Sequence, residues 1–172
     1  MQRICVFLFL ITALTFQSCK KEVVTPLDFS KITVTDSSCI YISLVDTTDW
    51  TADINWTAQE TGLLNFKRTV AVGDSIAGFI QVSAACPNPS AGRFALGINT
   101  ERACVMKLAI VNTEMQVLYF TNHAFTGGPI ITAYDLTSLT AFDKDENHRM
   151  YYAFYTSKDS LYYKGHGDFR IE

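Results

Sequence analysis

The chain has 172 residues, of which 48% are hydrophobic, 13% aromatic and only 18% charged. Such a composition can bury a core, and it excludes a largely disordered protein. The formal net charge is −3, so no basic excess invites nucleic acid. A chain of this length is expected to form one folded domain.

The first part of the chain has the features of an export signal. A positively charged start, Met1–Arg3, precedes an apolar run from Ile4 to Phe16, as in secretory signal peptides. The run is shorter than the roughly 20 apolar residues that a membrane-spanning helix needs. We therefore expect residues 1–18 to be removed as a signal peptide. The mature chain then holds 13 basic and 17 acidic residues, a formal charge of −4.

Ser18 and Cys19, which follow the apolar run, resemble the lipobox of bacterial lipoproteins. In that motif a small residue precedes a cysteine that is acylated and becomes the mature N-terminus. Phe16 and Gln17 depart from its tighter form, in which a leucine and a small residue stand. The resemblance implies lipidation of Cys19 by acyl chains such as palmitate, which anchor the protein in a membrane. The alternative is an ordinary secretory signal and a soluble exported protein with a spare thiol.

Lys20 occupies the position at which an aspartate retains lipoproteins in the inner membrane in the best-known sorting system. The resemblance therefore implies the cell envelope, with an outer-membrane anchor and either a periplasmic or a surface-exposed domain. Residues 19–30 contain Pro26 and lack apolar periodicity, which predicts a short tether. Residues 31–172 are expected to form a single domain.

Patterns typical of β-strands dominate the rest of the chain. Strict alternation of apolar and polar residues from Trp50 to Thr57 predicts a strand with one buried face. The other predicted strands are rich in Val, Ile, Phe and Thr. They cover Leu64–Val72, Ile76–Cys86, Phe94–Ile98, Cys104–Val111, Met115–Thr121, Arg149–Thr156, Leu161–Lys164 and Asp168–Glu172. Turn residues separate them, for example at Thr126–Pro129. Apolar residues recur at helical spacing only over Asp135–Asp145, which is compatible with one short helix.

Many short strands with regular turn signals predict an all-β protein. We expect an antiparallel β-sandwich, and the alternative is a closed β-barrel. Four features stand out within residues 50–111: a strand that contains Trp50 and Trp56, the run Ile80–Ala85, the loop Asn88–Ser90, and Arg93 before an apolar strand. In this pattern the segment resembles the immunoglobulin-like modules of bacterial cell-surface lipoproteins, including modules found beside carbohydrate-active domains. The resemblance implies an immunoglobulin-like sandwich.

Three cysteines follow Cys19 in the mature chain, at positions 39, 86 and 104. An exported protein enters an oxidising compartment, where one internal disulfide can form among them. Strand alternation places Cys86 and Cys104 in phase with the apolar residues of their strands, whereas Cys39 is out of phase. We therefore expect a Cys86–Cys104 disulfide, with three buried free thiols as the equal alternative. No C-x-x-C motif occurs, so a zinc site has little support.

No motif for catalysis is complete. In the run Gly73–Gly78 a nucleophile elbow would need glycine where Ala77 stands. The segment Asp143–Asn147 begins like a calcium loop, but His148 occupies the position of the required glycine. Gly165–Asp168 holds an imidazole and a carboxylate that general-base chemistry could use, yet without a nucleophile it is better explained as a turn. We expect no catalytic residues, no metal and no cofactor.

The three histidines, His123, His148 and His166, lack the spacing of metal ligands. None lies four residues from another histidine on a predicted helix. We therefore expect them to be isolated surface residues.

Aromatic residues gather near the C-terminus, and they motivate the functional hypothesis. Alternation sends Tyr151 and Tyr155 to one face of their strand and Tyr152 and Phe154 to the other. If the first face is exposed, its rings form a flat platform that stacks sugar rings or anchors a protein. The alternative is that both faces are covered. The residues of the predicted platform are Tyr151, Tyr155, Tyr162 and Tyr163.

The sequence favours a membrane-tethered, non-catalytic binding module for a glycan or a protein. An accessory or structural subunit of a cell-envelope complex is the alternative. In that case the aromatic face is buried against a partner chain.

Overall fold

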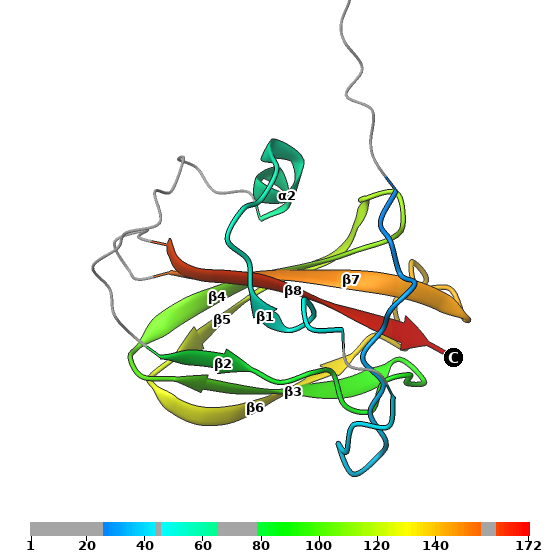
Figure 1. Ribbon diagram of the computed structural model, residues 1–172, viewed down its shortest axis with the longest axis horizontal. Helices are drawn as coiled ribbons and strands as arrows, with labels where there is room; N and C mark the ends of the chain where they lie inside the picture. Colours follow the sequence, from blue (N-terminus) through cyan, green and yellow to red (C-terminus); the bar gives the residue numbers. More distant parts are fainter. Residues whose placement is uncertain (1–25, 44–45, 65–78, 156–160) are drawn as a thin grey trace, which may run out of the picture.

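The computed structural model describes residues 26–43, 46–64, 79–155 and 161–172. Two antiparallel sheets pack against each other as the layers of a sandwich (Figure 1). The strands are β1 (Thr51–Ala52), β2 (Ile80–Val82), β3 (Arg93–Thr100), β4 (Cys104–Val111), β5 (Val117–Phe125), β6 (Gly128–Asp135), β7 (Glu146–Tyr155) and β8 (Leu161–Ile171), and the described helix is α2 (Ala58–Leu63). The larger sheet has the order β1-β8-β7-β4-β5, and the smaller has the order β2-β3-β6. The all-β class and the two-sheet arrangement are confirmed, and the described strands do not close into a barrel.

Alternate residues of the long strands build the core between the sheets. In β3 the buried apolar residues are Phe94, Leu96 and Ile98, and the residues between them face away from the core. Met106 and Leu108 contribute from β4 in the same way. Full burial of such a side chain contributes roughly 1.5–3 kcal/mol. A slip by one residue would expose the whole set, so this alternation fixes the register of both sheets.

Part of the outer face of the larger sheet, over β4 and β7, is covered by α2 and its flanking residues (Figure 1). Leu64 packs on Ala109 of β4 and Ala153 of β7, and Trp56 and Leu63 complete the cluster. The two alanine side chains leave room for the larger residues above them. β4 and β7 are therefore buried on both faces over this stretch.

The first described residues cross from the larger sheet to the smaller one. The Leu27 N–H donates to the Thr113 carbonyl in the turn between β4 and β5 (3.4 Å), and the Thr35 N–H donates to the Asn88 carbonyl (2.8 Å). Figure 1 shows this segment in blue, running from above the larger sheet to a loop below the smaller one. The end of the predicted tether thus contacts the domain. The predicted signal peptide and Cys19 lie outside the described residues.

The predicted Cys86–Cys104 disulfide is wrong. Cys86 pairs with Cys39, with the Cα atoms 5.2 Å apart, whereas Cys104 is buried and free. Strand alternation does not apply to Cys39, because this residue lies in a turn with φ of 64°. Its N–H donates to the Asp36 carbonyl (3.0 Å), which closes that turn. Cys104 lies in the core on β4, a strand of the larger sheet.

The strand expected over Trp50–Thr57 is shorter than predicted. Only Thr51–Ala52 is a strand, and α2 begins soon afterwards. The Thr57 hydroxyl accepts from the Glu60 N–H (3.2 Å), and the Glu60 carboxylate accepts from the Thr57 N–H (2.7 Å). This reciprocal capping box satisfies two N–H groups at the start of the helix. It outweighs the alternating pattern that precedes it.

Two further expectations are corrected by the structure. The short helix with which the spacing over Asp135–Asp145 was compatible is absent: Asp135 ends β6, and residues 136–145 form turns and loop. The turn expected over Gly165–Asp168 is part of β8, which runs unbroken from Leu161 to Ile171. Added Cβ atoms at Gly165 and Gly167 would collide with the Thr51 carbonyl and the Trp50 ring, respectively. These glycines therefore permit the close approach of β1.

The remaining strand predictions fall into two groups. Those around β3, β4, β5 and β7 are confirmed as strands, and β6 is an additional strand that begins within the turn predicted at Thr126–Pro129. Most of Leu64–Val72 and the start of Ile76–Cys86 lie outside the described residues, as does the Gly73–Gly78 run. Within the described ranges, no helix is long and apolar enough to cross a membrane.

Candidate functional site

Tyr151 does not form an exposed platform. Its side chain points outward from the larger sheet, as alternation predicts, but it is 0% exposed. The Trp56 ring meets it edge-on, with 5.5 Å between the centroids. Its hydroxyl donates to the Glu60 carboxylate (3.0 Å). The predicted ligand platform is therefore wrong at Tyr151, because the α2 segment covers this part of the sheet.

The other predicted platform residues do not share one surface. Tyr155 is half-buried on β7, with the Lys107 ammonium 5.6 Å from its ring centroid. Tyr163 packs against the core, where its ring lies 5.7 Å from the Phe154 ring. The side chain of Tyr162 lies outside the described residues. Among the side chains that are described, these tyrosines point to opposite faces of the larger sheet.

A buried ion pair joins β7 to β8 beside Tyr151. Arg149 donates from Nε and Nη2 to the two carboxylate oxygens of Asp168, at 2.6 and 2.7 Å. Burial raises the pKa of Asp168, although the Arg149 charge opposes this shift. Arg149 also donates to the Asp28 carbonyl (3.2 Å), and the Phe29 ring stacks 5.6 Å from its guanidinium. The pair therefore fastens the N-terminal segment to the sheet.

Asp49 lies next to this pair and has weaker partners. Its carboxylate accepts from the Asp168 N–H (3.1 Å) and from the N–H and hydroxyl of Thr33 (3.4 and 3.3 Å). The residue is only 4% exposed. Burial, helped by the nearby Asp168 charge, raises the pKa of Asp49 to about 7. The charge of Asp49 thus changes near neutral pH.

A second pair, Asp53 and His166, holds the start of the α2 segment. His166 Nδ1 lies 2.9 Å from Asp53 Oδ2, and Trp56 Nε1 donates to the same oxygen (2.6 Å). Burial lowers the pKa of His166, but the hydrogen bond and charge of Asp53 outweigh it and raise the pKa above its usual value. His166 and Asp168, the predicted imidazole and carboxylate pair, therefore bind different partners.

This polar network contains groups that can exchange protons near neutral pH, but its contacts hold segments of the chain against the larger sheet. The Asp53–His166 pair holds Trp56, which covers Tyr151, and the Arg149–Asp168 pair holds the N-terminal segment. Within the described ranges, no cluster of three His, Cys, Asp or Glu side chains could hold a metal ion. The network explains how the outer face of the larger sheet is closed.

The expectation of isolated surface histidines is wrong for His148 and His166. His148 is 0% exposed and lies between the rings of Phe142 and Phe169, at 5.1 and 5.5 Å. Burial lowers its pKa to about 4. His123 is half-buried, and burial lowers its pKa as well.

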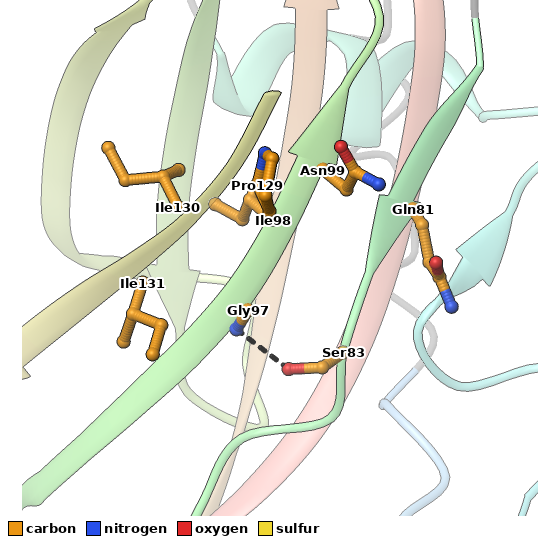
Figure 2. Close-up of a pocket in the computed structure, with 8 residues that line it drawn as sticks. All are labelled: Gln81, Ser83, Gly97, Ile98, Asn99, Pro129, Ile130 and Ile131. Atoms are coloured by element: carbon orange, nitrogen blue, oxygen red, sulfur yellow. Dashed lines mark hydrogen bonds between the residues drawn. The ribbon is translucent and has the colours of Figure 1, made fainter. Parts of the chain in front are cut away.

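The outer face of the smaller sheet is open and hollowed. A hollow of about 530 Å³ crosses its three strands, and Figure 2 shows the side chains that line it. Gly97 has no side chain to fill the floor, and its N–H donates to the Ser83 hydroxyl (2.8 Å). Ile131, which is 77% exposed, forms one wall. The lining residues are Gln81, Ser83, Gly97, Ile98, Asn99, Pro129, Ile130 and Ile131.

A second hollow of about 300 Å³ adjoins the first and shares Ser83, Gly97 and Ile131 with it. Its other lining residues include Ala95 and both cysteines of the disulfide, and Tyr41, 53% exposed, stands at its rim. We call the two hollows together the small-sheet groove. Its remaining lining residues are Thr35 and Ala84. Among the residues that the structure describes, no charged one lines either hollow.

No family model and no curated protein matches the chain. The small-sheet groove is therefore the candidate site on the strength of its own chemistry. Sequence reasoning missed it, although two signals were visible. Ala95 and Gly97 are small residues at the outward positions of one strand, and residues 115–134 contain no Asp, Glu, Lys or Arg.

Proposed function

We propose that the chain is an exported, lipid-anchored binding module that holds a protein ligand, without catalysis, in the small-sheet groove. The observation that carries this proposal is an uncharged groove left open on one face of the sandwich, whereas the α2 segment covers β4 and β7 on the opposite face. A floor of small residues with an exposed isoleucine at its wall suits an apolar side chain. The ligand is therefore an uncharged, apolar segment of another envelope protein.

A protein ligand is favoured over a glycan by the placement of the aromatic residues. Sugar rings are commonly held on flat aromatic faces, and Tyr151 is buried under Trp56. The groove itself has one aromatic residue at its rim, Tyr41. Its polar groups, at Gln81, Ser83 and Asn99, suit the backbone amides of a peptide.

A membrane anchor at Cys19 would set which face of the domain lies toward the membrane. Leu27 packs with Val111, Met115 and Tyr151 on the outer face of the larger sheet, which is opposite to the groove. The residues between Cys19 and Leu27 can span at most roughly 25–30 Å. A lipid at Cys19 would therefore hold the larger sheet toward the membrane and leave the groove facing away from it.

The non-catalytic assignment is supported by how the polar residues are used. The carboxylates and the imidazole of the polar network bind cations, N–H groups or each other within the fold. They hold the covering segments, and none of them lines the groove.

The immunoglobulin-like assignment belongs to the same proposal. Two packed antiparallel sheets support it. The aromatic strands β7 and β8 lie beyond the segment that carries the resemblance, and they occupy the middle of the larger sheet.

The proposal is tested by photocrosslinking in cells that produce the full chain. A photoreactive amino acid replaces Asn99, which lines the groove, and in a matched control it replaces Asn122, which is exposed on β5 of the larger sheet. We expect a discrete protein adduct from position 99 and none from position 122. No adduct from position 99, or the same adduct from both positions, would contradict the proposal.

A further inference from the structure

The edge strand β6 carries no charged side chain before its last residue, Asp135, which forms an ion pair with Arg93 of β3 (2.9 Å). From Met115 to Tyr134 the chain contains no Asp, Glu, Lys or Arg, and this run forms both β5 and nearly all of β6. Each of the two strands lies at the end of its sheet. Natural proteins commonly place charged side chains, especially lysine, on such edges to prevent pairing with another chain.

The hydrogen-bond pattern shows which backbone groups of β6 face outward. The Ser83 N–H donates to the Gly97 carbonyl (2.8 Å), and Ala95 exchanges two bonds with Cys86 (2.8 and 3.0 Å). Ala95 and Gly97 thus bond toward β2. Because bonding alternates along an antiparallel ladder, their cross-strand partners on β6 direct both backbone groups away from β3. These partners are Ala133 and Ile131.

The free edge begins at Ile131 and is accessible. Pro129, the first residue of β6 whose backbone groups point away from β3, has no N–H and cannot donate to an added strand. Ile131 and Ala133 keep theirs. Ile131 is 77% exposed and Ile130 is 46% exposed. Within the described residues β6 pairs only with β3. An extended polypeptide is the partner that such a row of backbone donors and acceptors requires.

We propose that β6 pairs with β6 of a second copy of this chain, antiparallel and about a two-fold axis at Thr132. In this register Ile131 exchanges backbone hydrogen bonds with Ala133 of the second copy, and Ala133 does so with Ile131. Thr132 then faces Thr132 of the second copy, a favourable cross-strand pair. The two smaller sheets join into one sheet of about six strands.

Charge and side-chain size favour a second copy as the occupant. The mature chain carries a formal charge of −4, so two copies repel each other except where their surfaces are neutral. The run from Met115 to Tyr134 provides such a surface. In the proposed register the large Ile131 of one copy lies opposite the small Ala133 of the other, so two large side chains do not meet there. The pairing does not depend on a ligand in the groove.

The register is tested by adding one cysteine at a time to the full chain, with the unsubstituted chain as the background for its own thiols. In the proposed pairing Thr132 lies directly opposite itself, at a position without hydrogen bonds where the Cα atoms approach to about 4.5 Å. Thr132→Cys should therefore give a disulfide-linked dimer on mild oxidation with copper phenanthroline. Ile130→Cys is the matched control, because residue 130 lies opposite Tyr134 of the second copy and should not crosslink. No dimer from Thr132→Cys, or equal dimer from both variants, would overturn the proposal.

A second measurement keeps the test independent of how the cysteine variants fold. Sedimentation of the purified full chain over a range of concentrations should show a monomer–dimer equilibrium. Ile131→Lys should raise the dissociation constant about tenfold or more, because it places charges at the paired edge. Val117→Lys, at an exposed position of β5, should leave it unchanged. A chain that stays monomeric throughout, or an equal effect of both lysines, would contradict the pairing.

Discussion

The two outer faces of the sandwich differ in how far other segments of the chain cover them. On the larger sheet, Trp56 and the α2 segment close the surface over Tyr151, and the ion pair of Arg149 and Asp168 holds the chain in place. On the smaller sheet, Ala95 and Gly97 leave a groove that no described segment covers. Bulky aromatic residues on a strand thus mark the face that supports stability. Small residues occur on both faces: Ala109 and Ala153 lie under Leu64 on the larger sheet, whereas no described segment covers Ala95 and Gly97 on the smaller one.

The strongest test of this contrast is truncation of an aromatic residue on each face. Tyr151→Ala should lower the free energy of unfolding by about 3–5 kcal/mol, because it leaves a cavity under Trp56. Tyr41→Ala, at the rim of the groove and 53% exposed, should lower it by less than about 1 kcal/mol. Urea denaturation of both variants measures the difference. Similar losses would show that the two faces are not distinguished by burial.

The Cys39–Cys86 disulfide lines the groove. Cys39 and Cys86 are 47 residues apart, and a crosslink of this span stabilises by about 2–4 kcal/mol. The Cys39→Ala/Cys86→Ala variant should lose stability in that range. Cys104→Ala, at a buried free cysteine, keeps the disulfide and serves as the comparison. Reduction should still lower its melting temperature, whereas it should not change the melting curve of Cys39→Ala/Cys86→Ala. A reduced parent chain as stable as the oxidised one would contradict the assigned pairing.

Asp49, which lies beside the Arg149–Asp168 pair, should make the free energy of unfolding depend on pH. Its pKa is raised from 3.8 to about 7 in the folded protein, so folding favours the protonated carboxyl. This contribution is complete below about pH 3.8 and is lost as pH rises through about 7. The free energy of unfolding should therefore fall as pH rises, and Asp49→Asn should remove on the order of 2–4 kcal/mol of this fall. The check is the free energy of unfolding of both chains from pH 4 to about pH 8.

His148 provides the internal control for the pH experiment, because its shift has the opposite sign. Its pKa is lowered from 6.5 to about 4, so its contribution is present above about pH 6.5 and is lost as pH falls through about 4. Asp49→Asn should leave this acid limb intact. If Asp49→Asn leaves the slope above about pH 5 unchanged, Asp49 does not titrate as described.

The smallest effect is expected at the open groove. Ile131→Ser should change the free energy of unfolding by less than about 0.5 kcal/mol, because the side chain is already 77% exposed. Ile98→Ser, at a residue that is 1% exposed on the core face of β3, should cost several-fold more. Equal costs in a denaturation experiment on the monomeric chain would mean that Ile131 is covered within the fold.

The sequence predicts the fold better than the site. Alternation locates β3, β4 and β7, since each repeats a buried residue at every second position over the core. The α2 helix was missed even though Thr57 and Glu60 form a recognisable capping box. The covering of Tyr151 could not be inferred, because Glu60 lies 91 residues away in the sequence. Local patterns report the period of a strand and do not report what packs on its second face.

The groove was harder to predict for a related reason. A missing side chain at Gly97 gives no positive signal, and its meaning depends on Ser83 and Ile131 from neighbouring strands. The prediction of the disulfide partners failed for a similar reason: Cys39 lies in a turn, where strand alternation says nothing about the direction of a side chain. The uncharged run from Met115 to Tyr134 was visible, and it is the signal that could have directed attention to this side of the sandwich.

The central claim is that the small-sheet groove holds the ligand, and one pair of matched variants tests it most directly. Ala95→Leu fills the groove, and Ala124→Leu makes the same change at an exposed position of β5 on the larger sheet. In each variant the yield of the adduct formed by a photocrosslinker at position 99 is measured in cells. We predict that Ala95→Leu abolishes the adduct and that Ala124→Leu preserves it. An undiminished adduct in Ala95→Leu would contradict the account.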